Sequence, residues 1–305
     1  MRVTNSMLLK NYTRNLHKNL NKMSKYQNQL SSGKEISKPS DDPFLVTRSM
    51  ALHTEIDKNE QYKRNIEDSI GWIDTTDSAM QNVTDIIHRM KELTTYGANG
   101  SLSDTDRQAL SEEVKQLTDQ LGQIGSTNFD GRYIFGGQET TEAPFKVEGG
   151  VLKYKGDKGE LEREFSPNVS MAVNLTGAEM MGLEGSVDTE NGTDTSLGVT
   201  LKEIVDALDS NDTEKLSGEL LGDIDNHLDN ILRARAKVGA KSNRLKAANK
   251  KNEAETLNTI EFLSKTEDID VAEKVMQYKN MENVYRSSLQ TGAKILQPSL
   301  LDFLR

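Results

Sequence analysis

The chain has 305 residues, of which 34% are hydrophobic, 5% aromatic and 28% charged. This composition is lean for one compact core, and it is typical of long helices that each bury one stripe. The net charge of −10 argues against a general nucleic-acid-binding protein, because contacts to phosphates need a basic surface. With no cysteine, the chain can form no disulfide and no thiolate metal site.

The longest apolar run near the N-terminus is Met7–Leu9. Three residues are too few for a secretory signal or a membrane span. We therefore expect no membrane partner. Export would have to use a route that depends on no cleavable hydrophobic signal.

Both ends of the chain carry an amphipathic pattern with one narrow apolar stripe. An isolated helix of this kind is marginal in water, because nucleation is costly and nothing covers its stripe. The pattern predicts two terminal helices that pair with each other or with neighbouring molecules. The residues expected at this assembly interface are Leu9, Tyr12, Leu16, Leu20, Met23 and Leu30 near one end, and Val275, Tyr278, Met281, Tyr285, Leu289, Leu296, Leu300, Leu301 and Phe303 near the other.

A break follows the first helix in the segment SSGKEISKPSDDP, residues 31–43. Asp42 before Pro43 is a ready N-cap with proline at the first helical position, so Asp41, Asp42 and Pro43 are interpreted as a helix-capping turn. Neighbouring aspartates do not face each other across a reaction site, which disfavours a catalytic carboxylate pair. The period then predicts one long helix as far as Gly97.

The chain turns back near Gly97–Ser103, and a further helix is expected through Ile124, capped by Ser103 or Asp104. Asp130-Gly131 is a hairpin dipeptide, and Tyr133–Phe135 favour a strand. Short strands are then expected in VLKYK, EREFS and MAVNL. Helix resumes at about Ser196, and a last long helix is interrupted at Thr266–Asp268 before the terminal one.

These elements predict a mainly α fold, an antiparallel helical bundle built from both chain halves with a small β-rich insertion. Three domains are expected: a terminal assembly region (1–42 with 266–305), a helical stalk (43–135 with 198–265) and the insertion (136–197). The stretch Arg233–Lys251 holds eight basic residues and no acid. We interpret it as a solvated helix face or as one that pairs with acidic neighbours in an assembly.

No catalytic, metal or cofactor site is expected. The histidines lie at no ligand spacing, and no convergent set of catalytic residues is present. The four histidines are His17, His53, His88 and His227.

The opening MRVTNSMLLKNYTRNLHKNLNKMSKYQNQLSSGKEISKPSDDP resembles the flagellin superfamily. Three features resemble its hook-associated branch more than flagellin itself: Asp41-Asp42-Pro43, FDGRYIFGGQETTEAPF from Phe129, and the ending KILQPSLLDFLR. RAKVGAKSNRL from Arg233 is typical of both branches. The resemblance leaves only the β insertion loosely matched.

The resemblance implies an elongated flagellin-like fold and a structural adaptor between hook and filament, with no catalytic activity. Such proteins are exported without processing by the flagellar type III system and assemble as a ring outside the cell. Their partners are a hook-associated protein on one side, flagellin on the other, and an export chaperone at the C-terminal helix. The terminal segments are disordered in the monomer and order on assembly. The alternatives are a minor flagellin and a cytosolic coiled-coil scaffold.

Overall fold

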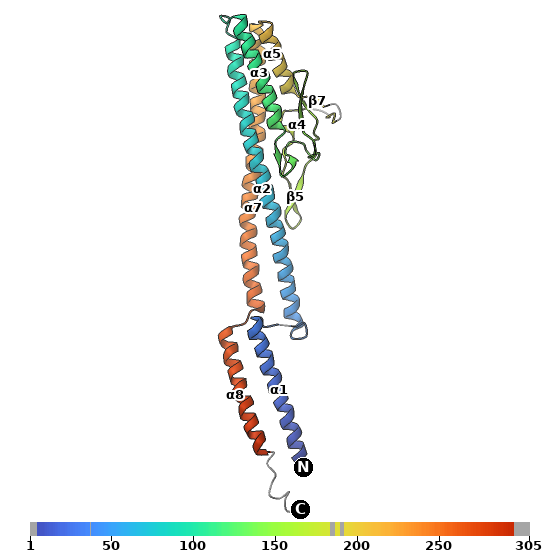
Figure 1. Cartoon of the computed structure of the whole chain (residues 1–305), viewed down its shortest axis with the longest axis vertical. Helices are drawn as coiled ribbons and strands as arrows, with labels where there is room; N and C mark the ends of the chain where they lie inside the picture. The colour runs from blue at the N-terminus through green and yellow to red at the C-terminus, as the bar shows by residue number, and fades with distance from the viewer. Residues whose placement is uncertain (1–4, 37, 184–186, 190–191, 296–305) are drawn as a thin grey trace, which may run out of the picture. The chain divides into compact units, whose positions relative to one another are not determined.

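The computed structural model is mainly α-helical (Figure 1). It divides into a terminal unit, residues 1–58 with 255–305, and a central unit, residues 59–254. The expected fold class, helices from both chain halves with a small strand-containing part, is confirmed. The three-domain division stays a prediction. The residues that the structure describes are 5–36, 38–183, 187–189 and 192–295.

The terminal unit contains two helices side by side, α1 (Asn5–Ser32) and α8 (Val271–Ile295) (Figure 1). It also contains the first turns of α2 (Pro43–Gly97) and the last turns of α7 (Leu221–Glu267). Gly33 ends α1 with φ +72°, a left-handed conformation that costs glycine little. Asp42 starts α2, because its Oδ1 accepts hydrogen bonds from the amides of Phe44 and Leu45 at 3.0 and 3.1 Å.

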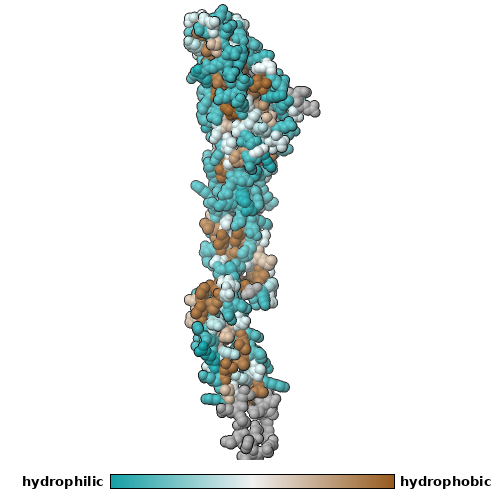
Figure 2. Space-filling view, viewed as in Figure 1, coloured by the Kyte–Doolittle hydropathy of each residue, from teal (hydrophilic) through white to brown (hydrophobic). Residues whose placement is uncertain are grey.

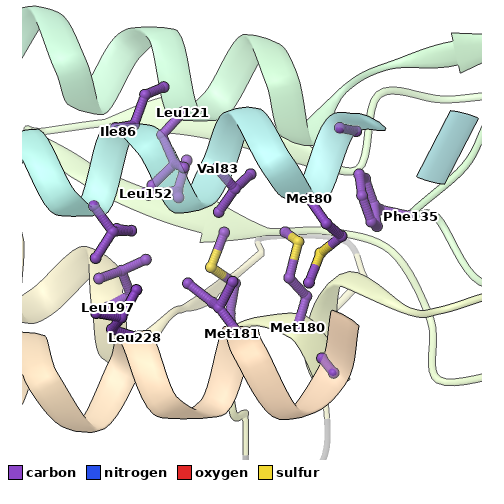
Figure 3. Close-up of a cluster of buried hydrophobic side chains, with 14 of the residues drawn as sticks. Met80, Val83, Ile86, Leu121, Phe135, Leu152, Met180, Met181, Leu197 and Leu228 are labelled. Carbon is purple, nitrogen blue, oxygen red and sulfur yellow. The ribbon is translucent and has the colours of Figure 1, made fainter. Parts of the chain in front are cut away.

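The central unit is held by one continuous hydrophobic core. The remainders of α2 and α7 pack there with α3 (Asp104–Gly125) and α5 (Ser196–Asp209). In Figure 3, Met80 and Val83 of α2 lie close to Met180, Met181 and residues of neighbouring elements. A short helix α6 (Thr213–Lys215) and a π-helical turn (Leu216–Leu220) lead into α7.

The strands form three small antiparallel sheets beside the helices. One is a hairpin of β1 (Asn128–Phe129) and β2 (Arg132–Tyr133) around Asp130-Gly131. A second pairs β5 (Glu162–Ser166) with β6 (Val169–Ala172). The third has the order β3-β4-β7 and is followed along the chain by α5; its strands are Phe145–Glu148, Val151–Tyr154 and Thr193–Asp194.

Two strand predictions extended too far. Ile134 and Phe135 follow β2 in a turn, and both are fully buried in the core. The strand expected in MAVNL ends at Ala172, before the short helix α4 (Gly177–Met180). Beyond Ala172, the Asn174 side chain accepts a hydrogen bond from Leu161 N and donates one to Gly159 O. The apolar residues Ile134, Phe135, Val173 and Leu175 are buried although none of them pairs in a strand.

The basic stretch of α7 binds acidic and aromatic groups of its own chain. Arg235 Nε lies 2.9 Å from Asp77 Oδ1, and Lys237 Nζ lies 2.5 Å from Glu179 Oε1. The Arg244 guanidinium lies 5.5 Å from the centre of the Phe165 ring. The acidic partners observed lie in the central unit of the same chain, and pairing with neighbours in an assembly stays a prediction.

A buried arginine holds the loop between α2 and α3. Arg107, 5% exposed, donates to the carbonyls of Gly97 (3.3 Å) and Asn99 (3.0 Å) and to Asn211 Oδ1 (3.2 Å). It thus binds the carbonyl of Gly97, the last residue of α2, and its charge suits the negative end of that helix. Ser103 caps α3 through a capping box with Asp106.

We expect Arg107→Ala to lower the free energy of unfolding of the central unit by about 2–3 kcal/mol, because three acceptors, one of them buried, lose a charged donor. The chain's one tryptophan, Trp72, is buried in this unit, so its fluorescence during urea unfolding measures the change. Arg64→Ala is the control. Arg64 is exposed and bonds only Gln61 and Glu60 at the surface, so its loss should cost less than about 0.5 kcal/mol.

Candidate assembly interface

The terminal unit buries almost no apolar side chain. Every member of the hydrophobic core lies between Ile66 and Leu245, in the central unit. In the described part of the terminal unit, Leu263 alone is a buried hydrophobic residue. The unit also holds thirteen of the seventeen large hydrophobic side chains exposed in the described chain. Figure 2 shows hydrophobic patches over the α1–α8 pair, so this unit offers surface for other molecules to cover.

The predicted stripe residues of α1 and α8 differ in how far the pairing covers them. Those that are half-buried are Tyr12, Leu16, Leu20, Met23, Leu30, Tyr278, Met281 and Tyr285. Leu9, Val275 and Leu289 are exposed. Leu296, Leu300, Leu301 and Phe303 lie outside the described residues. Their role at an assembly interface stays a prediction.

One close contact sets the distance between the two helices near the end of α8. Tyr12 Oη donates to the carbonyl of Ser288 at 3.0 Å. Gly292 is buried beside it, and a Cβ at this glycine would overlap the Tyr12 ring. The helices approach here because position 292 has no side chain.

The connections α1–α2 and α7–α8 are joined by backbone hydrogen bonds. Lys34 and Asp268 form an isolated antiparallel bridge. Glu35 N donates to Glu267 O at 2.6 Å, and Ile269 N donates to Gly33 O at 3.1 Å. The two breaks in the helical pattern, far apart in sequence, therefore form one joint.

The carboxylate of Glu267 lies at the centre of this joint. Its Oε1 accepts from Lys34 Nζ at 2.5 Å, and its Oε2 accepts from Ser49 Oγ at 2.6 Å with His53 Nε2 at 3.4 Å. Burial acts to raise the pKa of Glu267, but the hydrogen bonds from Lys34 and Ser49 outweigh it, so the pKa lies below its ordinary value. The ionised form is the one that the joint stabilises.

A second ion pair links α8 to the end of α1. Lys274 Nζ lies 2.8 Å from Glu35 Oε2 and 5.7 Å from the centre of the Tyr26 ring. Gln29, 1% exposed, donates to Glu35 O at 2.7 Å. α8 itself starts at Asp270, whose Oδ1 accepts from the amides of Ala272 and Glu273. The joint is therefore polar and specific, whereas the stripes beyond it are apolar and half covered.

Sequence analysis identified the stripes and Asp42 but missed the residues of the joint. The sequence places Glu267 in an interruption of the helical pattern and Lys34 in a turn. No spacing rule connects residues 233 positions apart, so their ion pair required the structure. Gly292 did carry a signal, since an isolated glycine inside a helical pattern often marks close packing.

The described residues contain no cluster of three or more potential metal ligands. No helix among them is long and apolar enough to cross a membrane. The terminal unit instead presents a pair of helices whose apolar stripes are only partly covered. Both helices are connected to the polar joint.

Two family models match the chain on either side of the strand-rich region. The bacterial flagellin N-terminal helical region matches residues 3–140, and the bacterial flagellin C-terminal helical region matches residues 221–304. The chain belongs to the flagellin family. The matched segments include α1, α8 and both connections of the joint.

Full-length relatives occur in both branches of this family. Flagellar hook-associated protein 3 of Escherichia coli is 27% identical, over 94% of this chain and 96% of its own. A flagellin of Halalkalibacterium halodurans is 26% identical over the whole of both chains. The solved structure of a flagellar hook-associated protein from Vibrio parahaemolyticus has the same fold, with a TM-score of 0.66 and 21% identity over 75% of this chain and 100% of that one. These relatives are named as flagellar components and none as an enzyme, in agreement with the prediction of a structural protein.

We expect Gly292→Ala to separate α1 from α8, because the added methyl group overlaps the Tyr12 ring; overpacking of this kind costs about 1–3 kcal/mol. The chain has no cysteine, so spin labels on cysteines introduced at the exposed positions Asn15 and Ser287 report the distance between the helices. The distance distribution should lengthen and broaden.

Adding Tyr12→Ala to Gly292→Ala removes the overlap and should narrow the distribution again. Gly239→Ala is the control, because a Cβ at this position of α7 meets nothing within 4 Å. That substitution should stabilise the helix by about 0.5–1 kcal/mol and leave the distance unchanged. An unchanged distribution in Gly292→Ala would refute the assigned packing.

We expect Glu267→Gln to loosen the joint, because Lys34 loses its charged partner. The amides of Glu35 and Ile269, which bridge the two connections, should exchange hydrogen about tenfold faster or more. Because the folded pKa of Glu267 is lowered, its stabilisation is complete above the ordinary value of 4.5 and is lost as pH falls through the folded pKa. After correction for intrinsic exchange, protection in the native chain should fall on acidification, and the variant should show a smaller change. Glu261→Gln, at an exposed pair with Lys265, should leave both amides protected.

Proposed function

We propose that this chain is a structural adaptor that joins the hook to the filament of a bacterial flagellum. The observation that carries the proposal is similarity along nearly the whole chain to a flagellar hook-associated protein 3. The motifs Asp41-Asp42-Pro43 and FDGRYIFGGQETTEAPF, from Phe129, add support. On this proposal the chain works outside the cell, at the hook–filament junction, after export without a cleaved signal peptide.

The terminal unit supports an assembly role on physical grounds. Full burial of a leucine, valine or phenylalanine side chain contributes about 1.5–3 kcal/mol, and the exposed Leu9, Val275 and Leu289 are uncovered within one chain. A few such contacts per neighbour offset the entropy lost when the helices become ordered. Assembly through the helices α1 and α8 is therefore favoured over folding of an isolated chain alone.

The proposed partners follow from this placement. Copies of the chain associate in a ring, with a hook-associated protein on the hook side and flagellin on the filament side. Before export, a chaperone covers the C-terminal helix. An amphipathic helix such as α8, with Met276 and Leu289 exposed, suits binding in an apolar groove.

A minor flagellin is the second candidate. Its support is the 26% identity to a flagellin over the whole of both chains. A filament subunit has to polymerise with itself without limit, whereas a junction protein has to stop. Purified protein that grows long filaments by itself would favour this alternative. A cytosolic scaffold would be favoured instead if the protein were missing from sheared appendages.

We expect cells that lack this gene to build hooks without filaments and to release flagellin into the medium. A gene shortened by the codons for residues 1–30 should not restore filaments. The shortened protein should nevertheless unfold with the same Trp72 fluorescence transition as the full chain, because the core lies in residues 59–254. Normal filaments in the deletion strain would refute the proposal.

A further inference from the structure

Helix α1 carries a continuous row of positive charge. Lys10, Arg14, Lys18 and Lys22 follow one another at intervals of four residues, with Lys25 three further on. All five side chains are exposed. The first aspartate or glutamate of the chain is Glu35, so α1 contains no acid at all. Residues at this spacing lie on one face of a helix.

This basic row lies on the face of α1 opposite to its apolar stripe. At 3.6 residues per turn, the stripe through Tyr12, Leu16 and Leu20 is about half a turn away from the row. Tyr12 bonds Ser288 of α8, so the stripe faces α8. The row therefore points away from α8, on the outside of the pair.

Nothing in the described chain compensates these charges. Arg14 donates to Asn11 Oδ1, a neutral group, and none of the five forms an ion pair among the described residues. On α8, the carboxylate of Glu282 forms ion pairs with Lys279 and Arg286 of the same helix. Like charges one turn apart destabilise a helix. α1 consequently gains stability from an anionic partner.

The rest of the chain has the complementary charge. The terminal unit holds 16 basic and 13 acidic residues, whereas the central unit holds 22 basic and 35 acidic residues. The net charges are therefore +3 and −13. Contact between two central units is repulsive, and contact of α1 with a central unit is attractive.

We propose that the basic row of α1 docks onto the acidic central unit of a second copy of this chain. The inference rests on the proposed function, because it names the contact that orders α1 during assembly. It assigns α1 two separate tasks. The apolar stripe binds α8, and the basic row binds the acidic neighbour.

An anionic membrane is a poorer partner for the same charges. A helix that binds a membrane surface inserts its apolar face among the lipids and leaves its basic face at the headgroups. In α1 the apolar face is turned to α8 and includes Tyr12, Leu16 and Leu20. A protein surface needs only the exposed row.

The test is sedimentation velocity of the full-length chain at low and high salt. We expect oligomers at low salt whose association weakens by roughly tenfold or more between about 20 mM and 0.3 M salt, as screening of exposed charges requires. Lys18→Glu with Lys22→Glu should abolish association at low salt. The new carboxylates lie one turn from Arg14 and Lys25, so α1 itself becomes a better helix, and circular dichroism should show no loss of helix.

Arg48→Glu with Lys58→Glu is the matched control. Both side chains are exposed on α2 of the terminal unit, and the change in charge is the same. This pair should associate within about twofold of the native chain. A native chain that stays monomeric at low salt would overturn the inference. An association whose strength does not change with salt, or does not change on charge reversal in α1, would also overturn the inference.

A cross-linking experiment identifies the molecule that the basic row of α1 binds. A photoreactive amino acid at position 18 should cross-link to residues 59–254 of another copy. Binding to phosphatidylglycerol vesicles with no such cross-link would overturn the inference in favour of a lipid surface. If gene deletion removes filaments but the double reversal on α1 still restores them, the docking inference fails and the adaptor function stands.

Discussion

The constraint on which the rest of the molecule depends is that apolar burial is confined to the central unit. Its core, from Ile66 to Leu245, can hold that unit without any neighbour. The terminal unit has no comparable core in its described part, and α1 and α8 rely on half-covered stripes. Folding and assembly are thereby separated along one chain. The central unit has a hydrophobic core of its own, whereas the terminal unit leaves apolar surface that contacts with other molecules could cover.

Polar groups take over where apolar burial is missing. Glu267 accepts hydrogen bonds from Lys34 and Ser49, and Lys274 forms an ion pair with Glu35. The joint is therefore held by directional contacts. Ion pairs of this kind contribute only a modest free energy. They nevertheless fix the geometry, because a hydrogen-bonded pair forms only at certain distances and angles. A weakly stable unit can therefore still present its helices in one arrangement. That combination suits a subunit that has to be guided into place.

Local patterns predicted the elements well because each depends on neighbouring residues. The apolar period gave α2 as one helix to Gly97, and the cap Ser103 gave the start of α3. Strand ends were less predictable, as at Phe135, because burial and ladder pairing coincide only in part. The joint could not be predicted, since the pairs that form it are more than 200 residues apart. The basic row of α1 follows from the four-residue spacing of its lysines and arginine, but the charge that it complements follows only from the division into units.

The bridge between Lys34 and Asp268 also limits how this family member can change by insertion or deletion. Surface connections between helices usually tolerate added residues. Here a residue added within α1 or α8, between the bridge and the Tyr12–Gly292 contact, would advance that helix by about 1.5 Å and turn it by about 100°. Tyr12 would then no longer meet Gly292, and the stripe would face away from its partner. The number of residues between the bridge and the Tyr12–Gly292 contact therefore sets which faces of the two helices meet.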